Sequence, residues 1–153
     1  MQTPRLPHHQ LAPEAFRAMV AVSEVLHASS LGRQLLALLE TRVSQLNGCA
    51  YCLDMHTREW LATGEELQRI AALTAWHEVP FYTERERAAL QWAESLTLLS
   101  QSHAPQEHFD ALRPHFSDQE IAQLTFCIAQ INAWNRLGVA MRVPVGRKAM
   151  AVS

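Results

Sequence analysis

Apolar residues recur at intervals of three and four positions along most of the chain, the spacing that lines one face of an amphipathic helix. No segment alternates apolar and polar residues with the period of two that a half-buried strand requires. The runs predict helices that begin at Pro13, after Ser30, at Cys49, at Glu65, after Thr83, at Pro105 and after Ser117. The pattern therefore predicts an all-α fold, a compact bundle of about seven helices.

Residues that stop or cap helices stand at the ends of these runs. Asn47 and Gly48 tolerate left-handed backbone angles and end the second run, and Pro80 ends the fourth. Thr83 and Ser117 are each followed three positions later by a glutamate, which is the spacing of a capping box. Local chemistry thus supports the helix boundaries that the apolar pattern indicates.

The last predicted helix is the longest, and it is apolar around much of its circumference from Asp118 to about Val139. In a small chain such a helix is expected to contact neighbouring subunits as well as its own core, so we expect a homo-oligomer. The four tryptophans are candidates for the same core or subunit contacts: Trp60, Trp76, Trp92 and Trp134.

The composition is typical of one globular domain. With 153 residues, 48% of them hydrophobic, the chain can bury a core. We assign residues 13–145 to a single helical domain, 1–12 to an N-terminal extension and 146–153 to a C-terminal tail. A formal net charge of −2 indicates no nucleic-acid or anionic-membrane partner. Since no apolar run approaches the ~20 residues that span a bilayer, and no signal-peptide core is present, we expect a cytoplasmic protein.

Two distant segments resemble each other. Residues 44–49 read Ser-Gln-Leu-Asn-Gly-Cys, and residues 129–134 read Ala-Gln-Ile-Asn-Ala-Trp. One interpretation is a duplicated helix pair in which the first copy kept the polar chemistry and the second became packing. Chance similarity is the other, because few positions match.

The main chemical signal is the set Cys49, Cys52 and His56. At about 100° per residue these positions lie on one side of a helix. Cysteines three positions apart in a first turn can form a disulfide, and a helix N-terminus favours the thiolate. His56, one turn beyond Cys52, can accept or relay a thiol proton. The spacing therefore favours a dithiol that cycles with a disulfide and can reduce a peroxide through a sulfenic acid.

Other interpretations of these residues stay open. The cysteines can be apolar packing, or can bind zinc with His56, although this set supplies only three ligands of the four that a structural site needs. Cys127 lies in an apolar run and is expected to be a buried, inert thiol. The remaining histidines of the helices and loops are expected to be solvated surface residues: His27, His77, His103, His108 and His115.

The segment from Arg42 to His56, with the sequence Arg-Val-Ser-Gln-Leu-Asn-Gly-Cys-Ala-Tyr-Cys-Leu-Asp-Met-His, resembles the core signature of the alkylhydroperoxidase D-like branch of the carboxymuconolactone decarboxylase family. Residues 131–136, Ile-Asn-Ala-Trp-Asn-Arg, resemble a second stretch typical of its small members. The resemblance, over roughly residues 15 to 142, implies an all-helical fold and thiol-dependent peroxidase activity without metal, haem or another cofactor. It also implies assembly into trimers or hexamers, with Cys49 and Cys52 as the redox pair and His56 in a proton relay.

The chain departs from the family pattern at two positions. The relay glutamate that usually precedes the first cysteine by twelve residues is replaced by Ala37, and we nominate Glu40, one turn later, as its substitute. The histidine that often precedes the second cysteine is replaced by Tyr51. Both changes concern the rate and the natural substrate.

We predict that Cys52 attacks the peroxide with His56 as general base and Glu40 orienting it, and that Cys49 then closes the disulfide. The helix end favours Cys49 as the more acidic thiol, so the assignment of the attacking cysteine stays open. A dithiol reductant, of thioredoxin-like or dihydrolipoyl type, is needed to reset the pair. The alternatives are a redox-sensing module with little turnover and a cofactor-free lyase of the carboxymuconolactone decarboxylase type.

Overall fold

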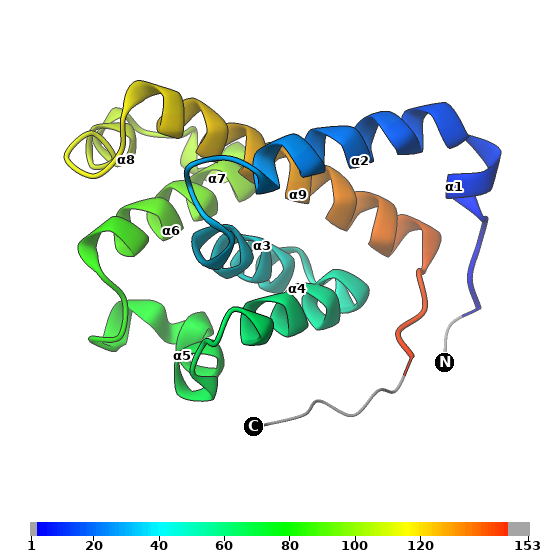
Figure 1. The fold of residues 1–153 in the computed structure, drawn as a ribbon, viewed down its shortest axis with the longest axis horizontal. Helices are drawn as coiled ribbons and strands as arrows, with labels where there is room; N and C mark the ends of the chain where they lie inside the picture. The colour runs from blue at the N-terminus through cyan, green and yellow to red at the C-terminus, as the bar shows by residue number, and fades with distance from the viewer. Residues whose placement is uncertain (1–2, 147–153) are drawn as a thin grey trace.

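The computed structural model describes residues 3–146 as a helical bundle, which confirms the all-α prediction (Figure 1). No strand occurs among these residues. The helices are α1 (His8–Leu11), α2 (Pro13–His27), α3 (Arg33–Asn47), α4 (Ala50–Ala62), α5 (Leu67–Ala72), the 3₁₀ helix η1 (Leu73–Glu78), α6 (Glu84–Thr97), α7 (Leu99–Ser102), α8 (Gln106–Asp110) and α9 (Asp118–Met141). The predicted helix over 65–78 is divided into α5 and η1, and the short helices α1 and α7 were not predicted.

Helix α3 forms the centre of the bundle and packs against α4, α6 and α9. Leu36, Leu39 and Val43 lie on one side of α3 and Leu38 on the opposite side, yet all four are completely buried, because neighbours cover the helix on most sides. Three of the four tryptophans are also in the core, namely Trp60, Trp76 and Trp92, while Trp134 is half-buried. The site described below combines Glu40 of this central helix with residues of α4, which packs against it.

The predicted helix boundaries agree with the structure where local chemistry determines them. Both capping boxes are present, with Thr83 and Ser117 each accepting a hydrogen bond from the backbone N–H of the glutamate three positions later. Gly48 ends α3 in the left-handed conformation, with φ of +66°. This tight turn leads directly into α4, which packs antiparallel beside α3 (Figure 1).

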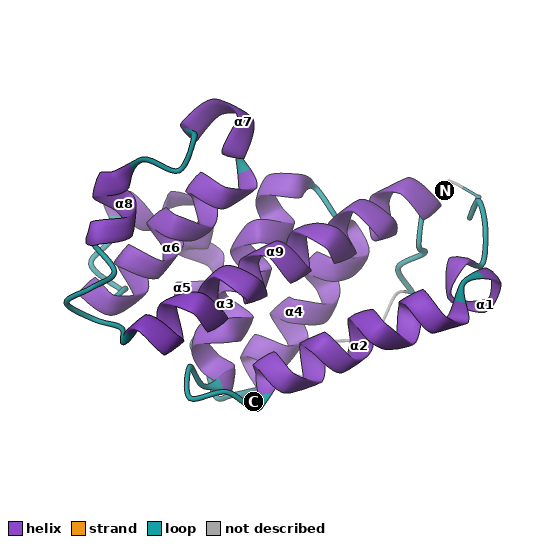
Figure 2. Ribbon diagram, turned by 90° about the horizontal axis from the view of Figure 1, so that it is seen from above, coloured by secondary structure: helices purple, strands orange, loops and turns teal. Residues whose placement is uncertain are grey.

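Helix α2 packs on α9 and extends away from the rest of the bundle, with α1 at its outer end (Figure 2). Gln130 Nε2 donates to the backbone oxygen of Met19 at 2.7 Å, and the Trp134 indole donates to Ser23 Oγ at 3.0 Å. These contacts hold α2 against the second half of α9. None of the helices in the described residues is long and apolar enough to cross a membrane.

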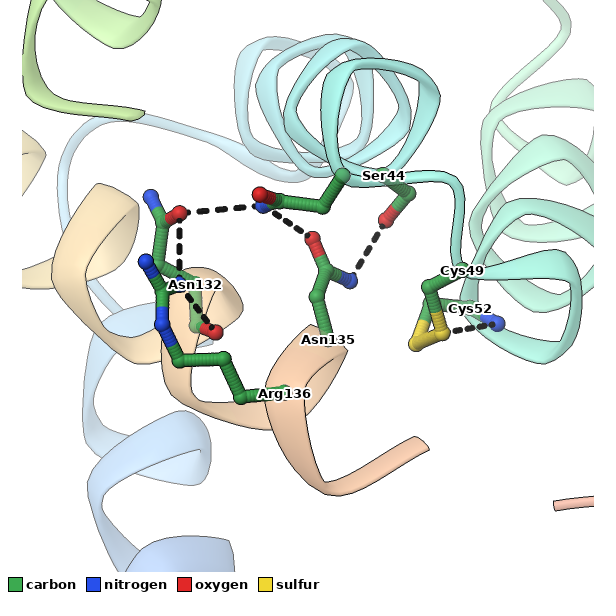
Figure 3. The surroundings of a disulfide bond; sticks show 7 residues. Ser44, Cys49, Cys52, Asn132, Asn135 and Arg136 are labelled. Carbon is green, nitrogen blue, oxygen red and sulfur yellow. Dashed lines mark hydrogen bonds between the residues drawn. A yellow bond between two sulfur atoms is a disulfide. The ribbon is translucent and has the colours of Figure 1, made fainter. Parts of the chain in front are cut away.

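The two similar segments contact each other. Asn47 Nδ2 donates to the side-chain oxygens of Asn132 and Asn135, both at 2.9 Å, and Asn135 Nδ2 donates to Ser44 Oγ at 3.0 Å (Figure 3). We call Ser44, Asn47, Asn132 and Asn135 the asparagine network. The first segment breaks at Gly48, whereas the second is the interior of the continuous helix α9. The second segment has no counterpart of the break, and the duplication stays a prediction.

Candidate active site

The two cysteines of the motif are joined in a disulfide at the start of α4 (Figure 3). The turn at Gly48 makes Cys49 the N-cap residue of α4 and puts Cys52 in its first turn. Cys49 Sγ accepts a hydrogen bond from the backbone N–H of Cys52 at 3.3 Å. The Cα atoms are 5.3 Å apart, within the usual range for a disulfide, so the spacing gives the pair that the sequence predicts.

Helix α9 passes directly over the disulfide at Gly138. A Cβ atom at this position would lie 2.7 Å from Cys49 Sγ and 3.3 Å from Cys52 Sγ, so only glycine allows so close an approach of the helix backbone. Cys49 is 1% exposed and Cys52 3% exposed. Of the two, only Cys52 lines the large cavity described below.

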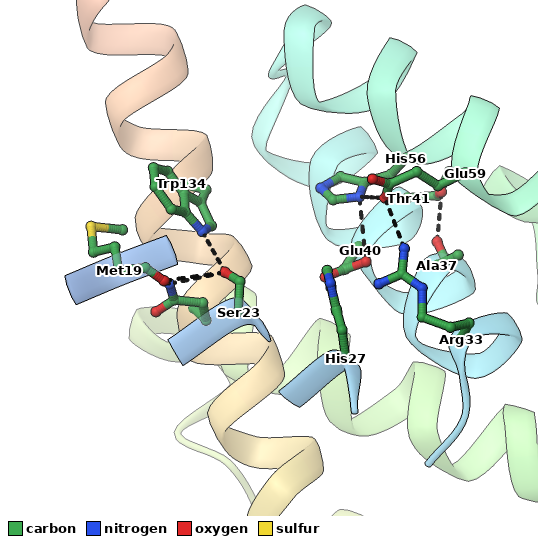
Figure 4. Close-up of polar contacts among 11 residues, drawn as sticks. Met19, Ser23, His27, Arg33, Ala37, Glu40, Thr41, His56, Glu59 and Trp134 are labelled. Carbon is green, nitrogen blue, oxygen red and sulfur yellow. Dashed lines mark hydrogen bonds and ion pairs between the residues drawn. The ribbon is translucent and has the colours of Figure 1, made fainter. Parts of the chain in front are cut away.

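His56 lies one turn after Cys52 on α4, and two carboxylates hold its ring (Figure 4). Its Nδ1 is 2.9 Å from Glu59 Oε2 and 3.3 Å from Glu40 Oε2. Glu40 comes from α3, and its other oxygen lies 2.8 Å from His27 Nε2 at the end of α2. Ionised carboxylates only accept hydrogen bonds, so each of these ring nitrogens carries a hydrogen. We call His27, Glu40, His56 and Glu59 the carboxylate–histidine cluster.

Electrostatics keep His56 and Glu40 charged at neutral pH. Burial alone would lower the pKa of His56, but the hydrogen bonds and negative charges of Glu40 and Glu59 raise it to about 9. Burial alone would raise the pKa of Glu40, but the hydrogen bonds and charges of His27 and His56 lower it to about 2. His56 is therefore an imidazolium beside ionised Glu40. This changes the expected role of His56 from a proton acceptor to a proton donor.

The structure brings Glu40, the predicted substitute for the relay glutamate, into contact with His56, while Ala37 is buried in the core. It corrects the interpretation of His27, which the sequence assigned to the solvated surface. His27 is half-buried, bonds Glu40 and lines the cavity. One local signal was available, since His27 directly follows the buried Leu26 at the end of the apolar face of α2.

The structure agrees in part with the burial expected for Cys127 and for the other histidines. Cys127 is buried, and burial raises the pKa of its thiol, which keeps it protonated. His77 and His103 are exposed as expected, and His115 is half-buried. His108 is also half-buried, with its Nδ1 hydrogen-bonded to Ser95 Oγ.

A cavity of about 810 Å³ opens beside the cluster. Cys52, Glu40 and His56 line it, together with residues of α2, α9 and the N-terminal segment. Because Nδ1 of His56 is bonded to the carboxylates, Nε2 is on the opposite edge of the ring, buried and without a hydrogen-bond partner in the described residues. A buried N–H without a partner is costly. This nitrogen is therefore suited to donate to a molecule that enters the cavity.

Metal binding was the alternative use of these residues. The sulfurs of Cys49 and Cys52 are bonded to each other, so they do not form a zinc-ligand set with His56 in this state. Glu40, His56 and Glu59 do bring ligand atoms within 4.8 Å of one another. In the cluster, however, His56 Nδ1 carries a proton that pairs with the two carboxylates. A metal ion would have to displace this proton to bind there.

Residues 13–95 match the model of the carboxymuconolactone decarboxylase family, and the chain belongs to this family. It is 39% identical over 137 residues to the uncharacterized protein YdfG of Bacillus subtilis (strain 168), covering 90% of this chain and 93% of that protein. A crystal structure from Agrobacterium tumefaciens, of a protein of unknown function proposed to be the antioxidant defence protein AhpD, superimposes with a TM-score of 0.92. It is 38% identical, over 95% of this chain and all of that one.

The debrominase Bmp8 has the same fold with a TM-score of 0.75, at 24% identity over 88% of this chain and 72% of that one. This similarity concerns the fold alone. Family membership and the AhpD-like neighbour support an enzyme, with a function of the antioxidant-defence or carboxymuconolactone decarboxylase type. The alkylhydroperoxidase D-like identity expected from the motif is thereby confirmed.

Proposed function

We propose that the protein is a thiol-dependent peroxidase that reduces hydroperoxides through a cycle of the Cys49–Cys52 pair. The observation that carries the proposal is the pairing of a cavity-lining sulfur with a cavity-lining imidazolium. Cys52 and His56 both border the same cavity, and the Nε2 of His56 has no partner in the described residues. A cation beside a cysteine stabilises the thiolate, which is the nucleophilic form.

In the first step the Cys52 thiolate attacks the distal oxygen of the hydroperoxide. The sulfur–oxygen bond forms as the oxygen–oxygen bond breaks, so that Cys52 is oxidised to a sulfenic acid and the peroxide is reduced. The departing alkoxide takes the proton from His56 Nε2 and leaves as the alcohol. Glu40 and Glu59 hold the ring by Nδ1, which leaves the proton on Nε2 for this transfer.

In the second step the Cys49 sulfur attacks the sulfur of the Cys52 sulfenic acid. The disulfide forms, the sulfur–oxygen bond breaks, and the hydroxyl group leaves as water with the thiol proton of Cys49. The exposure of Cys52 to the cavity supports its role as the attacking residue, because Cys49 does not line the cavity.

An external dithiol, of thioredoxin-like or dihydrolipoyl type, then reduces the disulfide and is itself oxidised. Attack through the cavity reaches Cys52, so that Cys49 leaves as a thiolate. Its Sγ accepts the backbone N–H of Cys52 at the N-terminus of α4, where the helix dipole stabilises negative charge. The position of Cys49 therefore suits a leaving group.

The test is hydroperoxide consumption by the purified protein with dithiothreitol as reductant. The wild type is expected to turn over repeatedly, and Cys52→Ser to lose at least about 100-fold in rate, because the nucleophile is absent. Cys127→Ala, which changes the buried inert thiol, is the matched control and is expected to keep the wild-type rate. Cys49→Ser is expected to accumulate a sulfenic acid on Cys52, detected by mass spectrometry after trapping with dimedone.

Two other results would overturn the proposal. A protein that oxidises once and consumes no more than one peroxide per chain is a redox sensor. An enzyme whose activity on a lactone or carboxylate substrate survives replacement of both Cys49 and Cys52 is a cofactor-free lyase of the decarboxylase type.

We also propose a cytoplasmic homo-oligomer, a trimer or hexamer. Large apolar side chains that are exposed in the single chain support it, such as Phe126 on α9 and Val25 on α2, at 65% and 72% exposure. Light scattering is expected to give a mass several times that of the 17.3 kDa chain. A 17 kDa species alone would contradict this.

A further inference from the structure

A second pocket, of about 670 Å³, opens between the end of α6, the short helix α7 and α9. It shares no lining residue with the cavity at Cys52, and the proposed reaction makes no use of it. Its volume lies in the range of about 300–1,000 Å³ that is typical of small-molecule sites. None of its lining residues is acidic, and Arg136 of α9 brings a permanent positive charge to it.

The guanidinium group of Arg136 is held in place at one end. Its Nη1 donates to the backbone oxygen of Asn132 at 2.8 Å and to Asn132 Oδ1 at 3.0 Å (Figure 3). A side chain that is already positioned loses less conformational freedom when it binds a ligand. None of the ion pairs among residues 3–146 includes Arg136. The pocket therefore contains a positioned cation with no carboxylate of the described chain paired to it.

Thr97, the last residue of α6, adds a hydroxyl group to the same pocket. Its side chain is nearly buried, and its Oγ1 accepts a hydrogen bond from Asn132 Nδ2 at 3.1 Å. A hydroxyl group also has a hydrogen to donate, and no described residue accepts one from Thr97. Because an unused buried donor costs free energy, an acceptor that enters the pocket would be stabilised there.

Apolar side chains form another part of the wall. Leu96, Leu99 and Ala129 line the pocket, and Leu99 is 52% exposed in the single chain. Covering such surface with the apolar body of a ligand is favourable. Positive charge, a hydroxyl donor and apolar surface thus occur together, which favours an organic anion over a cation or a neutral molecule.

We infer that this pocket binds a small organic anion, a carboxylate or a phosphate monoester. Arg136 and Thr97 donate to its anionic oxygens, and its organic body packs against Leu96 and Leu99. The guanidinium group suits both kinds of anion, because its N–H donors match the spacing of carboxylate and phosphate oxygens. The inference is independent of the proposed peroxidase, since no residue of the pocket takes part in that reaction.

The test is titration of the full chain with benzoate and with phenyl phosphate, followed by calorimetry, with neutral benzamide for comparison. The wild type is expected to bind at least one of the anions saturably and not to bind benzamide. The anion that binds more tightly identifies the preferred group.

Arg136→Gln is expected to lower the affinity for that anion at least about tenfold, because the charge and the paired donors are lost. Arg17→Gln is the matched control, since Arg17 is also exposed but lines neither pocket. Its loss is expected to change the affinity less than about twofold.

A second pair of variants leaves Arg136 in place. Ala129→Trp fills the pocket from α9 and is expected to lower the affinity at least about tenfold. Ala122→Trp makes the same change two turns earlier, at an exposed residue on the same side of α9 that does not line the pocket. It is expected to change the affinity less than about twofold.

Three results would overturn the inference. The first is the absence of saturable binding of both anions. The second is an affinity that stays unchanged in Arg136→Gln or in Ala129→Trp, or that falls equally in a variant and its control. The third is a wild type that binds neither anion together with a lower mass of Arg136→Gln by light scattering, because a carboxylate of a neighbouring subunit would then occupy the pocket.

Discussion

Two polar groups, each partly buried, flank the disulfide, and they differ in charge and in completeness. The asparagine network joins α3 to α9 through neutral side chains, and Asn47 and Asn135 bond to one another and to their neighbours. The one charged group that bonds it among the contacts of Figure 3 is Arg136, which donates to Asn132 Oδ1 at 3.0 Å. The carboxylate–histidine cluster joins α2, α3 and α4 through charged side chains, and it leaves His56 Nε2 without a partner in the described residues.

This difference separates the structural from the reactive side of the disulfide. A satisfied neutral network costs little to bury and fixes the position of one helix against another. In the charged cluster the N–H at His56 Nε2 is buried without an acceptor in the described residues, which costs free energy. A substrate that accepts this hydrogen bond removes that cost. We therefore expect the asparagine network to support stability and the carboxylate–histidine cluster to support reaction.

The largest expected effect comes from His56→Gln. Loss of the proton donor and of the cation beside Cys52 is expected to lower kcat/KM for a hydroperoxide by about 10²- to 10⁴-fold, measured with dithiothreitol as reductant. The control is His108→Gln, because His108 is a half-buried histidine that bonds Ser95 but does not line the cavity. Similar activity losses in both variants would contradict the special role of His56.

The second prediction concerns the pH dependence of stability, which is expected to come from the carboxylate–histidine cluster and not from the asparagine network. His56 has a raised pKa of about 9 against an ordinary 6.5, so the stability it contributes is complete below pH 6.5 and is lost as the pH rises through 9. Glu40 has a lowered pKa of about 2 against 4.5, so its contribution is present above pH 4.5 and is lost as the pH falls toward 2.

Urea unfolding between pH 6.5 and 9 is the measurement. The free energy of unfolding is expected to fall with a slope of up to about 1.4 kcal/mol per pH unit, the value for one proton. In His56→Gln this slope is expected to be absent, whereas Asn135→Ala is expected to keep it. A wild-type curve that is flat over this range would refute the charged state of the cluster.

Asn135→Ala is expected to affect stability more than chemistry. It removes the bonds to Asn47 and Ser44 from a completely buried position, so the free energy of unfolding is expected to fall by about 1–3 kcal/mol. At a temperature where both proteins are folded, kcat/KM is expected to stay within threefold of the wild type. A large activity loss with unchanged stability would reverse the roles assigned to the two groups.

An effect of similar size on stability, but confined to the oxidised protein, is expected of Gly138→Ala, where α9 crosses the disulfide. The added methyl group would approach Cys49 Sγ to 2.7 Å, so the oxidised protein is expected to be destabilised by about 1–3 kcal/mol. In the reduced protein the sulfurs can separate, and the better helix propensity of alanine offsets part of the loss. Thermal unfolding with and without dithiothreitol measures the difference. An equal loss in both states would contradict contact with the bonded sulfurs.

Interactions within one or two helical turns were predictable from the residues alone. The capping glutamates stand three positions from Thr83 and Ser117, Gly48 ends α3, and Cys52 and His56 are four positions apart. In each case backbone geometry and spacing decide the contact, whatever the rest of the chain does. The motif could therefore be interpreted as a thiol pair with a neighbouring imidazole before any tertiary structure was considered.

The packing of distant segments decided the protonation of His56 and the space around Cys52. Glu40 meets His56 only because α3 and α4 pack together, and His27 joins them from the end of α2. These contacts change a presumed base into an imidazolium, and the cavity is enclosed by residues as distant as Arg5 and Met141. Pattern and spacing determine which side chains share a helix face, but charge and enclosure depend on which faces meet, and those are properties of the folded chain.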